Sequence, residues 1–135
     1  MYRRLSKLEF QQYIQQHWKQ EEIEMYRDAK LGHGIGCYQD NILLGFAWYK
    51  TKANKYWRLK HLYPEIWMIL LLEVHLYQRQ QGIGSRILDE IYRRLPKGKA
   101  LVIGSERTEK HKQFYIKNGF VEDEAMEYFF IKSKF

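Results

Sequence analysis

The hexapeptide Arg79-Gln80-Gln81-Gly82-Ile83-Gly84 connects an apolar run to an amphipathic segment in a chain of 135 residues. The run at 66–72 is too short to span a membrane, and its Ile and Leu content is typical of a strand covered on both faces. After the glycines, apolar residues recur at helical spacing as far as Leu95. Pro96 and Gly98 end the predicted helix. The pattern therefore predicts a strand, a glycine turn and a helix in that order.

A glycine turn that opens a helix is suited to an anionic ligand. The first backbone N–H groups of a helix have no intrahelical partners, and the helix dipole favours negative charge there. Glycine lets the ligand approach the backbone closely. A glycine turn that merely begins a helix gives the same pattern, so the spacing has to distinguish the candidate ligands.

The spacing disfavours a dinucleotide. A dinucleotide-binding turn places its first glycine directly after the strand and a third small residue three positions after the second glycine. Ile87 occupies that third position, and residues 75–81 separate Val74 from Gly82. Glu106 lies at a tolerable distance for a ribose contact, but the connecting segment is too long for the tight dinucleotide turn.

The segment Leu72-Glu73-Val74-His75-Leu76, followed by residues 79–84, resembles the coenzyme A signature of the GNAT N-acetyltransferase superfamily, whose core is Arg/Gln-x-x-Gly-x-Gly/Ala. Leu76 replaces the usual proline. The resemblance implies a pyrophosphate held by backbone N–H groups around Gln81 to Ser85, and a pantetheine arm that pairs with the strand near Val74. The cofactor-binding residues implied in this stretch are Val74, Leu76, Arg79, Gln80, Gln81, Gly82, Ile83, Gly84 and Ser85.

A second motif, Phe114-Tyr115-Ile116-Lys117-Asn118-Gly119-Phe120, resembles the GNAT segment Phe/Leu-Tyr-x-Lys-x-Gly-Phe. By this resemblance Tyr115 is the candidate catalytic acid that protonates the leaving sulfur, and it is also a candidate cofactor contact. The alternative is that Tyr115 only packs or hydrogen-bonds to the cofactor. The family often has asparagine seven residues earlier; Thr108 occupies that position and is a candidate pantetheine contact.

The remaining patterns predict an α/β fold in one domain, residues 1–135, because no repeat or linker is present. We expect a mixed, mostly antiparallel sheet of six or seven strands flanked by about four helices, as in GNAT proteins. The expected elements are a strand at 1–5, a helix from a capping box at Ser6 and Glu9, a helix at 21–29, a flexible connection at 32–36, a hairpin of 35–38 and 42–49 around 39–41, a strand at 100–104, a helix at 106–118 capped by Gly119, and strands at 120–122 and 128–132.

Charge and composition restrict the partners and the location. Lys and Arg number 23 against 16 Asp and Glu, so the formal net charge is +7. This favours polyanionic partners, among them coenzyme A, without requiring nucleic acid. The basic, aromatic stretch 50–63 is either an acceptor-side surface or a solvated loop, and it leaves single-stranded nucleic acid open as a partner. No segment predicts a membrane span or signal peptide, so we expect a cytoplasmic protein with no membrane partner.

Cys37 is the only cysteine, which rules out an internal disulfide and a cysteine-based metal cluster. It lies in a predicted strand and is expected to be a small buried hydrophobe rather than a nucleophile. No metal site is predicted.

The resemblance implies transfer of an acetyl group from acetyl-coenzyme A to a primary amine by direct attack on the thioester. A strand N–H near Val74 is implied to stabilise the oxyanion. The acceptor is expected to be an amine-bearing small molecule or peptide, and a homodimer is left open. The alternative is a non-catalytic module on the same fold that senses acyl-coenzyme A or binds nucleic acid.

No general base can be transferred from the family. Several members carry Glu or His on the fourth strand, four to six residues before the valine, where this chain has Leu70 and Met68. Strict alternation along the strand places Glu73 on the face opposite to these two positions. The missing base favours the non-catalytic alternative, whereas Tyr115 favours the enzyme.

Overall fold

The computed structural model describes residues 2–17, 32–51, 66–74, 82–105, 107–124 and 126–134. In chain order the elements are β1 (Tyr2–Leu5), α1 (Lys7–His17), β2 (His33–Gln39), β3 (Ile42–Lys50), β4 (Ile66–Val74), α4 (Ile83–Arg94), β5 (Lys99–Gly104), α5 (Glu109–Lys117), β6 (Val121–Glu122) and β7 (Phe129–Lys134). None of the helices in these ranges is both long and apolar enough to cross a membrane.

The seven strands form one sheet in the order β1-β2-β3-β4-β5-β7-β6. Only β4 and β5 pair in parallel; the other pairs within these ranges are antiparallel. The predicted mixed, mostly antiparallel α/β sheet is therefore confirmed. The described ranges contain three helices instead of about four, and the predicted helix at 21–29 lies outside them.

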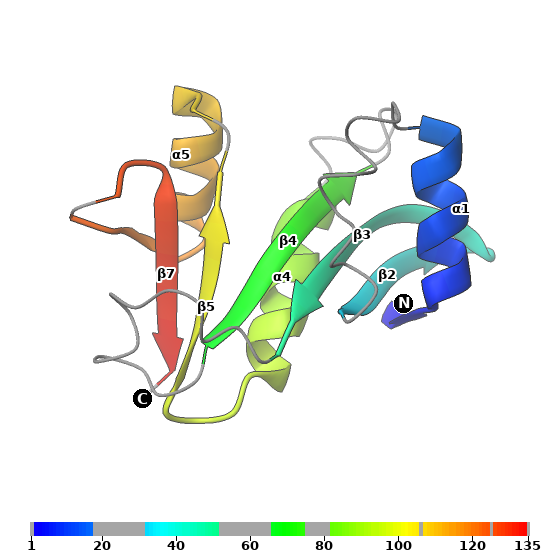
Figure 1. The fold of residues 1–135 in the computed structure, drawn as a ribbon, viewed down its shortest axis with the longest axis horizontal. Coiled ribbons are helices and arrows are strands. Elements are labelled where there is room, and N and C mark those ends of the chain that lie inside the picture. The colour runs from blue at the N-terminus through cyan, green and yellow to red at the C-terminus, as the bar shows by residue number, and fades with distance from the viewer. Residues whose placement is uncertain are drawn as a thin grey trace.

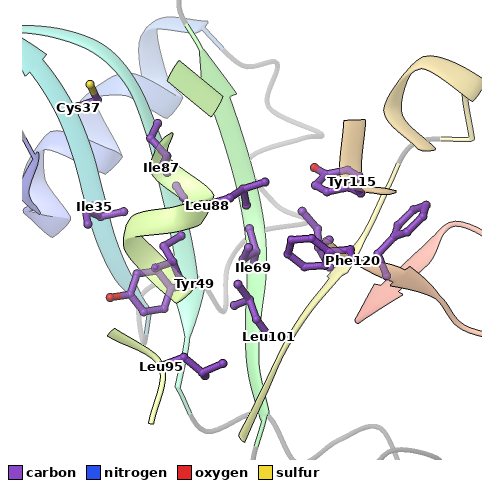
Figure 2. Close-up of a cluster of buried hydrophobic side chains, with 14 of the residues drawn as sticks. Ile35, Cys37, Tyr49, Ile69, Ile87, Leu88, Leu95, Leu101, Tyr115 and Phe120 are labelled. Carbon is purple, nitrogen blue, oxygen red and sulfur yellow. The ribbon is translucent and has the colours of Figure 1, made fainter. Parts of the chain in front are cut away.

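The helices cover both faces of the sheet (Figure 1). On one face, Phe10 of α1 packs with Phe46 and Trp48 of β3. On the other face, the main core joins side chains of α4 and α5 to the centre of the sheet (Figure 2), among them Ile35, Ile69, Ile87, Leu101 and Tyr115. We call these the α1 face and the α4 face.

The first half of the chain follows local sequence signals closely. The backbone N–H of Glu9 donates to Ser6 Oγ at 3.1 Å and that of Ser6 to Glu9 Oε1 at 3.2 Å, which confirms the capping box. Phe10 stacks on Trp48 with ring centroids 4.2 Å apart. Leu8, expected on the apolar stripe of this helix, is 63% exposed and makes that part of the prediction wrong.

The β2–β3 hairpin turns at Asp40 and Asn41, with φ of 51° and 65°, as the sequence predicts. The flexible connection predicted at 32–36 is wrong, because β2 already begins at His33. A Cβ at Gly34 would lie 2.6 Å from the Trp48 ring, so the absence of a side chain lets that ring lie flat on the strand.

Helix α5 is delimited by two predicted residues. Thr108 has extended backbone angles and accepts a hydrogen bond from the His111 N–H, so it is the N-cap and the helix begins later than predicted. At the other end, Gly119 has φ of 88° and the Phe120 N–H donates to Tyr115 O at 3.0 Å. This is the left-handed cap expected at Gly119.

Candidate functional site

β4 is paired on both sides only along its first half. Ile66–Ile69 pair with Ala100–Ile103 of β5, and that register ends there. On the other side, β3 pairs with β4 as far as Val74. Figure 1 shows β4 and β5 separating toward their carboxyl ends. The second half of β4 therefore borders the separation between the two strands.

A β-bulge lies where the pairing with β5 ends. Trp48 of β3 is opposite Leu71, and the next residue, Tyr49, is opposite Ile69. Leu70 is therefore the extra residue on β4. Such a bulge changes which face the following side chains occupy, and nothing in the apolar sequence of this strand signals it.

The bulge moves Glu73 to the α1 face. Leu70 and Leu71 are consecutive, yet both pack with the cluster on the α1 face. Glu73 is directly opposite Phe46, a member of the same cluster, and residues opposite one another on paired strands share a face. The prediction from strict alternation, that Glu73 lies opposite to Leu70 and Met68, is wrong.

The first turn of α4 contains four of the predicted cofactor-binding residues, Gly82 to Ser85. Gly82 is the N-cap with φ of 76°, no side chain caps this end, and the first turn has no acidic residue. The Arg86 N–H donates to Gly82 O at 3.0 Å, so the N–H groups of Ile83, Gly84 and Ser85 precede the helical hydrogen bonds. This end has the features of an anion site, because exposed N–H groups and the helix dipole attract negative charge.

Gly84 is the point at which the two sequence motifs meet. A Cβ at this position would lie 3.2 Å from Phe114 Cζ and 3.7 Å from Val74 Cγ2. The end of β4, the start of α4 and the side of α5 are thus in contact here. The absence of a side chain at Gly84 permits this approach.

Tyr115 is 5% exposed and is held by three aromatic rings. It stacks on Phe130 with centroids 5.3 Å apart and makes edge contacts with Phe114 at 5.1 Å and Phe120 at 5.7 Å. In Figure 2 its hydroxyl oxygen is at the end of the ring that faces β4. The packing fixes the ring next to the separation of β4 and β5.

The other predicted contacts differ in what the structure adds. Thr108 Oγ1 accepts from the His111 N–H at 3.2 Å and also contacts His111 Nδ1, so this hydroxyl already has a role as a helix cap. Leu76, Arg79, Gln80 and Gln81 lie outside the described residues, as does most of the basic stretch 50–63.

Cys37 is buried in the main core, as expected of a small hydrophobe. Within the described ranges, no three His, Cys, Asp or Glu side chains form a group that could hold a metal ion.

A polar cluster at the carboxyl end of β5 was not predicted. Tyr128 has φ of 57°, a rare conformation for a bulky residue. Its N–H donates to Glu122 Oε2 at 2.9 Å, and its carbonyl accepts from the Ser105 N–H at 2.8 Å. That backbone hydrogen bond, with the ion pair to Lys112 at 3.1 Å, lowers the pKa of Glu122. No sequence signal marks Tyr128, because its conformation depends on these contacts between distant segments.

Comparison with known proteins adds a family and a set of folds. Residues 30–122, more than half of the chain, match the model of the acetyltransferase (GNAT) domain. No similar protein is found among the curated sequences compared.

Among solved structures, a GNAT-family protein from Desulfovibrio desulfuricans has a TM-score of 0.70 at 15% identity, over 98% of both chains. Arabidopsis thaliana NAA60, solved with acetyl-CoA, has 0.69 at 15% identity, also over 98% of both chains. The PaiA N-acetyltransferase of Thermoplasma acidophilum, solved with coenzyme A, has 0.60 at 21%, over 97% of this chain and 80% of that one. At these identities the likeness concerns the fold.

Proposed function

The chain belongs to the GNAT acetyltransferase family, and we propose that it transfers an acetyl group from acetyl-coenzyme A to a primary amine. One observation carries the proposal: the uncapped start of α4, the end of the separating β4 and the Phe114–Tyr115 segment of α5 meet around Gly84. This juxtaposition combines an anion site, a strand edge and a tyrosine hydroxyl.

We assign the cofactor contacts as follows. The N–H groups of Ile83, Gly84 and Ser85 bind the pyrophosphate, since they lie in the uncapped first turn. The strand backbone near Val74 positions the pantetheine arm and directs an N–H at the thioester oxygen, where negative charge develops. The bound acetyl-coenzyme A supplies an electrophilic thioester carbonyl. Leu76, Arg79, Gln80, Gln81 and Thr108 complete the proposed cofactor site.

Tyr115 is proposed as the acid that protonates the leaving thiolate. Its ring is fixed by Phe114, Phe120 and Phe130, so the hydroxyl is held in one place before the cofactor binds. A positioned proton donor of this kind contributes about 100-fold or more to a rate.

The proposed function is tested by adding acetyl-coenzyme A to the full chain. A ligand that binds only the folded state raises the melting temperature. Release of free thiol is then followed with spermidine, lysine, a tripeptide with a free N-terminus and aminoacyl-RNA as acceptors. We expect a thermal shift and thiol release with at least one of the amines. No shift at saturating cofactor contradicts both the transfer reaction and cofactor sensing.

The role of Tyr115 is tested by Tyr115→Phe, with Tyr92→Phe as the matched control. Tyr92 donates its hydroxyl to Ser133 O at 3.2 Å, between α4 and β7. We expect turnover to fall about 100-fold in the first variant only, with the thermal shift by acetyl-coenzyme A unchanged in both. Equal turnover of Tyr115→Phe and wild type assigns Tyr115 to packing.

One observation favours the alternative of a non-catalytic module. Met68 and Leu70, where several family members carry a base, both pack in an apolar cluster on the α1 face. A sensor binds acetyl-coenzyme A without thiol release from any amine. A nucleic-acid-binding module shows affinity that falls steeply with salt.

A further inference from the structure

Glu73 is the only acidic residue in β4, and it lies in the half of the strand that extends beyond the pairing with β5. Its neighbour Val74 packs on the α4 face, within reach of Gly84. Because of the bulge at Leu70, Glu73 itself is on the α1 face, opposite Phe46. The strand therefore presents the proposed cofactor contact and a carboxylate at consecutive positions, on opposite faces.

This arrangement separates donor and acceptor. The proposed pyrophosphate contacts in α4 are on the α4 face, so the cofactor reaches the edge of β4 from that face. An amine that attacks the thioester has to approach from a direction that the cofactor leaves open. At Val74 that direction is the α1 face, and Glu73 is adjacent there, about 3.3 Å further along the strand.

Other titratable groups of the α1 face are engaged elsewhere. Glu9 of α1 accepts from the Tyr38 hydroxyl at 2.8 Å, from the Ser6 N–H and from Arg3. These contacts join α1 to β1 and β2, away from the separation of β4 and β5. Lys50 is opposite Met68, in the paired half of β4. Among the described residues, Glu73 is thus the carboxylate of this face in the separating half of β4.

We propose that Glu73 is the general base that deprotonates the acceptor amine; this inference rests on the proposed acetyl transfer. The carboxylate takes one proton from the ammonium group. The nitrogen lone pair then forms the C–N bond to the thioester carbon, and the C–S bond breaks with its electron pair on sulfur. Tyr115 gives a proton to the thiolate and is reprotonated by the second proton that nitrogen loses. The products are the acetylated amine, coenzyme A thiol and one proton.

The test compares Glu73→Gln with Asp89→Asn, which removes the same charge from the exposed side of α4. Both are assayed with the most active alkylamine of the panel and with hydroxylamine, which is already neutral near pH 7 and needs no base. We expect kcat/KM of Glu73→Gln to fall about 100-fold with the alkylamine and less than about tenfold with hydroxylamine. Its alkylamine rate rises with pH as the free amine itself deprotonates.

The outcomes separate this inference from the proposed function. A wild type that releases no thiol with any amine overturns both. An active wild type with an equally active Glu73→Gln, or with equal losses for the two nucleophiles, overturns only the role of Glu73. The thermal shift by acetyl-coenzyme A remains that of wild type, because the cofactor contacts are on the other face. If Glu73→Gln does not fold, Glu73→Asp replaces it, and the expected result is partial activity with the wild-type pH profile.

Discussion

Two glycine pairs at the same spacing serve different purposes in this molecule. Gly34 and Gly36 lie inside β2, where the rings of Trp48 and Tyr38 occupy the space that side chains would fill. Gly82 and Gly84 lie at the start of α4, where the first supplies a left-handed φ and the second admits Phe114. The first pair builds the core on the α1 face, and the second shapes the proposed ligand site.

The difference teaches that a Gly-x-Gly pattern has no meaning without its neighbours in space. In β2 the glycines make room for side chains of the same sheet. In α4, nothing among the described atoms lies within 4 Å of a Cβ built at Gly82, so only its backbone conformation and access to the N–H groups need glycine. Substitutions at the two sites should therefore separate stability from ligand binding.

The largest effect is expected for Gly34→Ala. The added Cβ would be 2.6 Å from Trp48 and 2.7 Å from Leu5 Cβ, and neither can move without disturbing the core. Overpacking of this kind costs about 3 kcal/mol, to be measured by urea unfolding. The control is Gly104→Ala in β5, whose Cβ would meet no atom nearer than 3.9 Å and should change stability by less than about 0.5 kcal/mol. Equal stability of the two variants would break the comparison.

A smaller effect with a sharper contrast is expected for Gly82→Ala, matched by Gly98→Ala. Gly82 has φ of 76° and Gly98 has φ of 87°, and a Cβ at either meets no described atom within 4 Å. Both variants should lose about 1.5 kcal/mol, because alanine is strained in the left-handed region. Only Gly82→Ala should reduce the thermal shift by coenzyme A. A shift reduced equally in both variants would remove Gly82 from the ligand site.

For Gly84 the expected signal is a coupling rather than a loss. Gly84→Ala gains about 1 kcal/mol of helix propensity, which offsets the close contact of its Cβ with Phe114. In a double-mutant cycle with Phe114→Leu, we expect a coupling energy of about 1 kcal/mol in unfolding free energy, since the shorter side chain relieves the contact. Additive effects would mean that Phe114 moves away freely.

Local signals predicted much of the fold. The capping box at Ser6, the Asp40–Asn41 turn and the cap at Gly119 each depend on residues close in sequence, and all three are confirmed. The family resemblance likewise anticipated that Gly84 and Tyr115 belong to one site. Their placement around the end of β4 agrees with it, although their roles remain proposals.

What sequence reasoning missed depends on pairing between distant segments. The bulges at Leu44 in β3 and Leu70 in β4 each insert one residue in a strand whose alternation looks regular, and they exchange the faces of the residues that follow. The face of Glu73 could not be deduced for that reason. The φ of Tyr128 likewise requires Glu122 and Ser105, which only the folded sheet brings together.

The smallest effect concerns Tyr38, whose ring lies on Gly36 in the first glycine pair. Burial, together with the hydrogen bond to Glu9, raises the pKa of Tyr38 to about 12 from 10.0. The folded state thus favours the neutral phenol, so its contribution to stability is complete below pH 10.0 and is lost as the pH rises toward about 12. Because Glu9 is partly exposed, we expect only about 0.5 kcal/mol. Urea unfolding of wild type and Tyr38→Phe at about pH 9 and about pH 11 measures it: the wild type should lose more stability between the two conditions, since phenylalanine has no proton to lose. An equal loss in both proteins would show that ionisation of Tyr38 is not linked to folding, and that the ring on Gly36 contributes by packing alone.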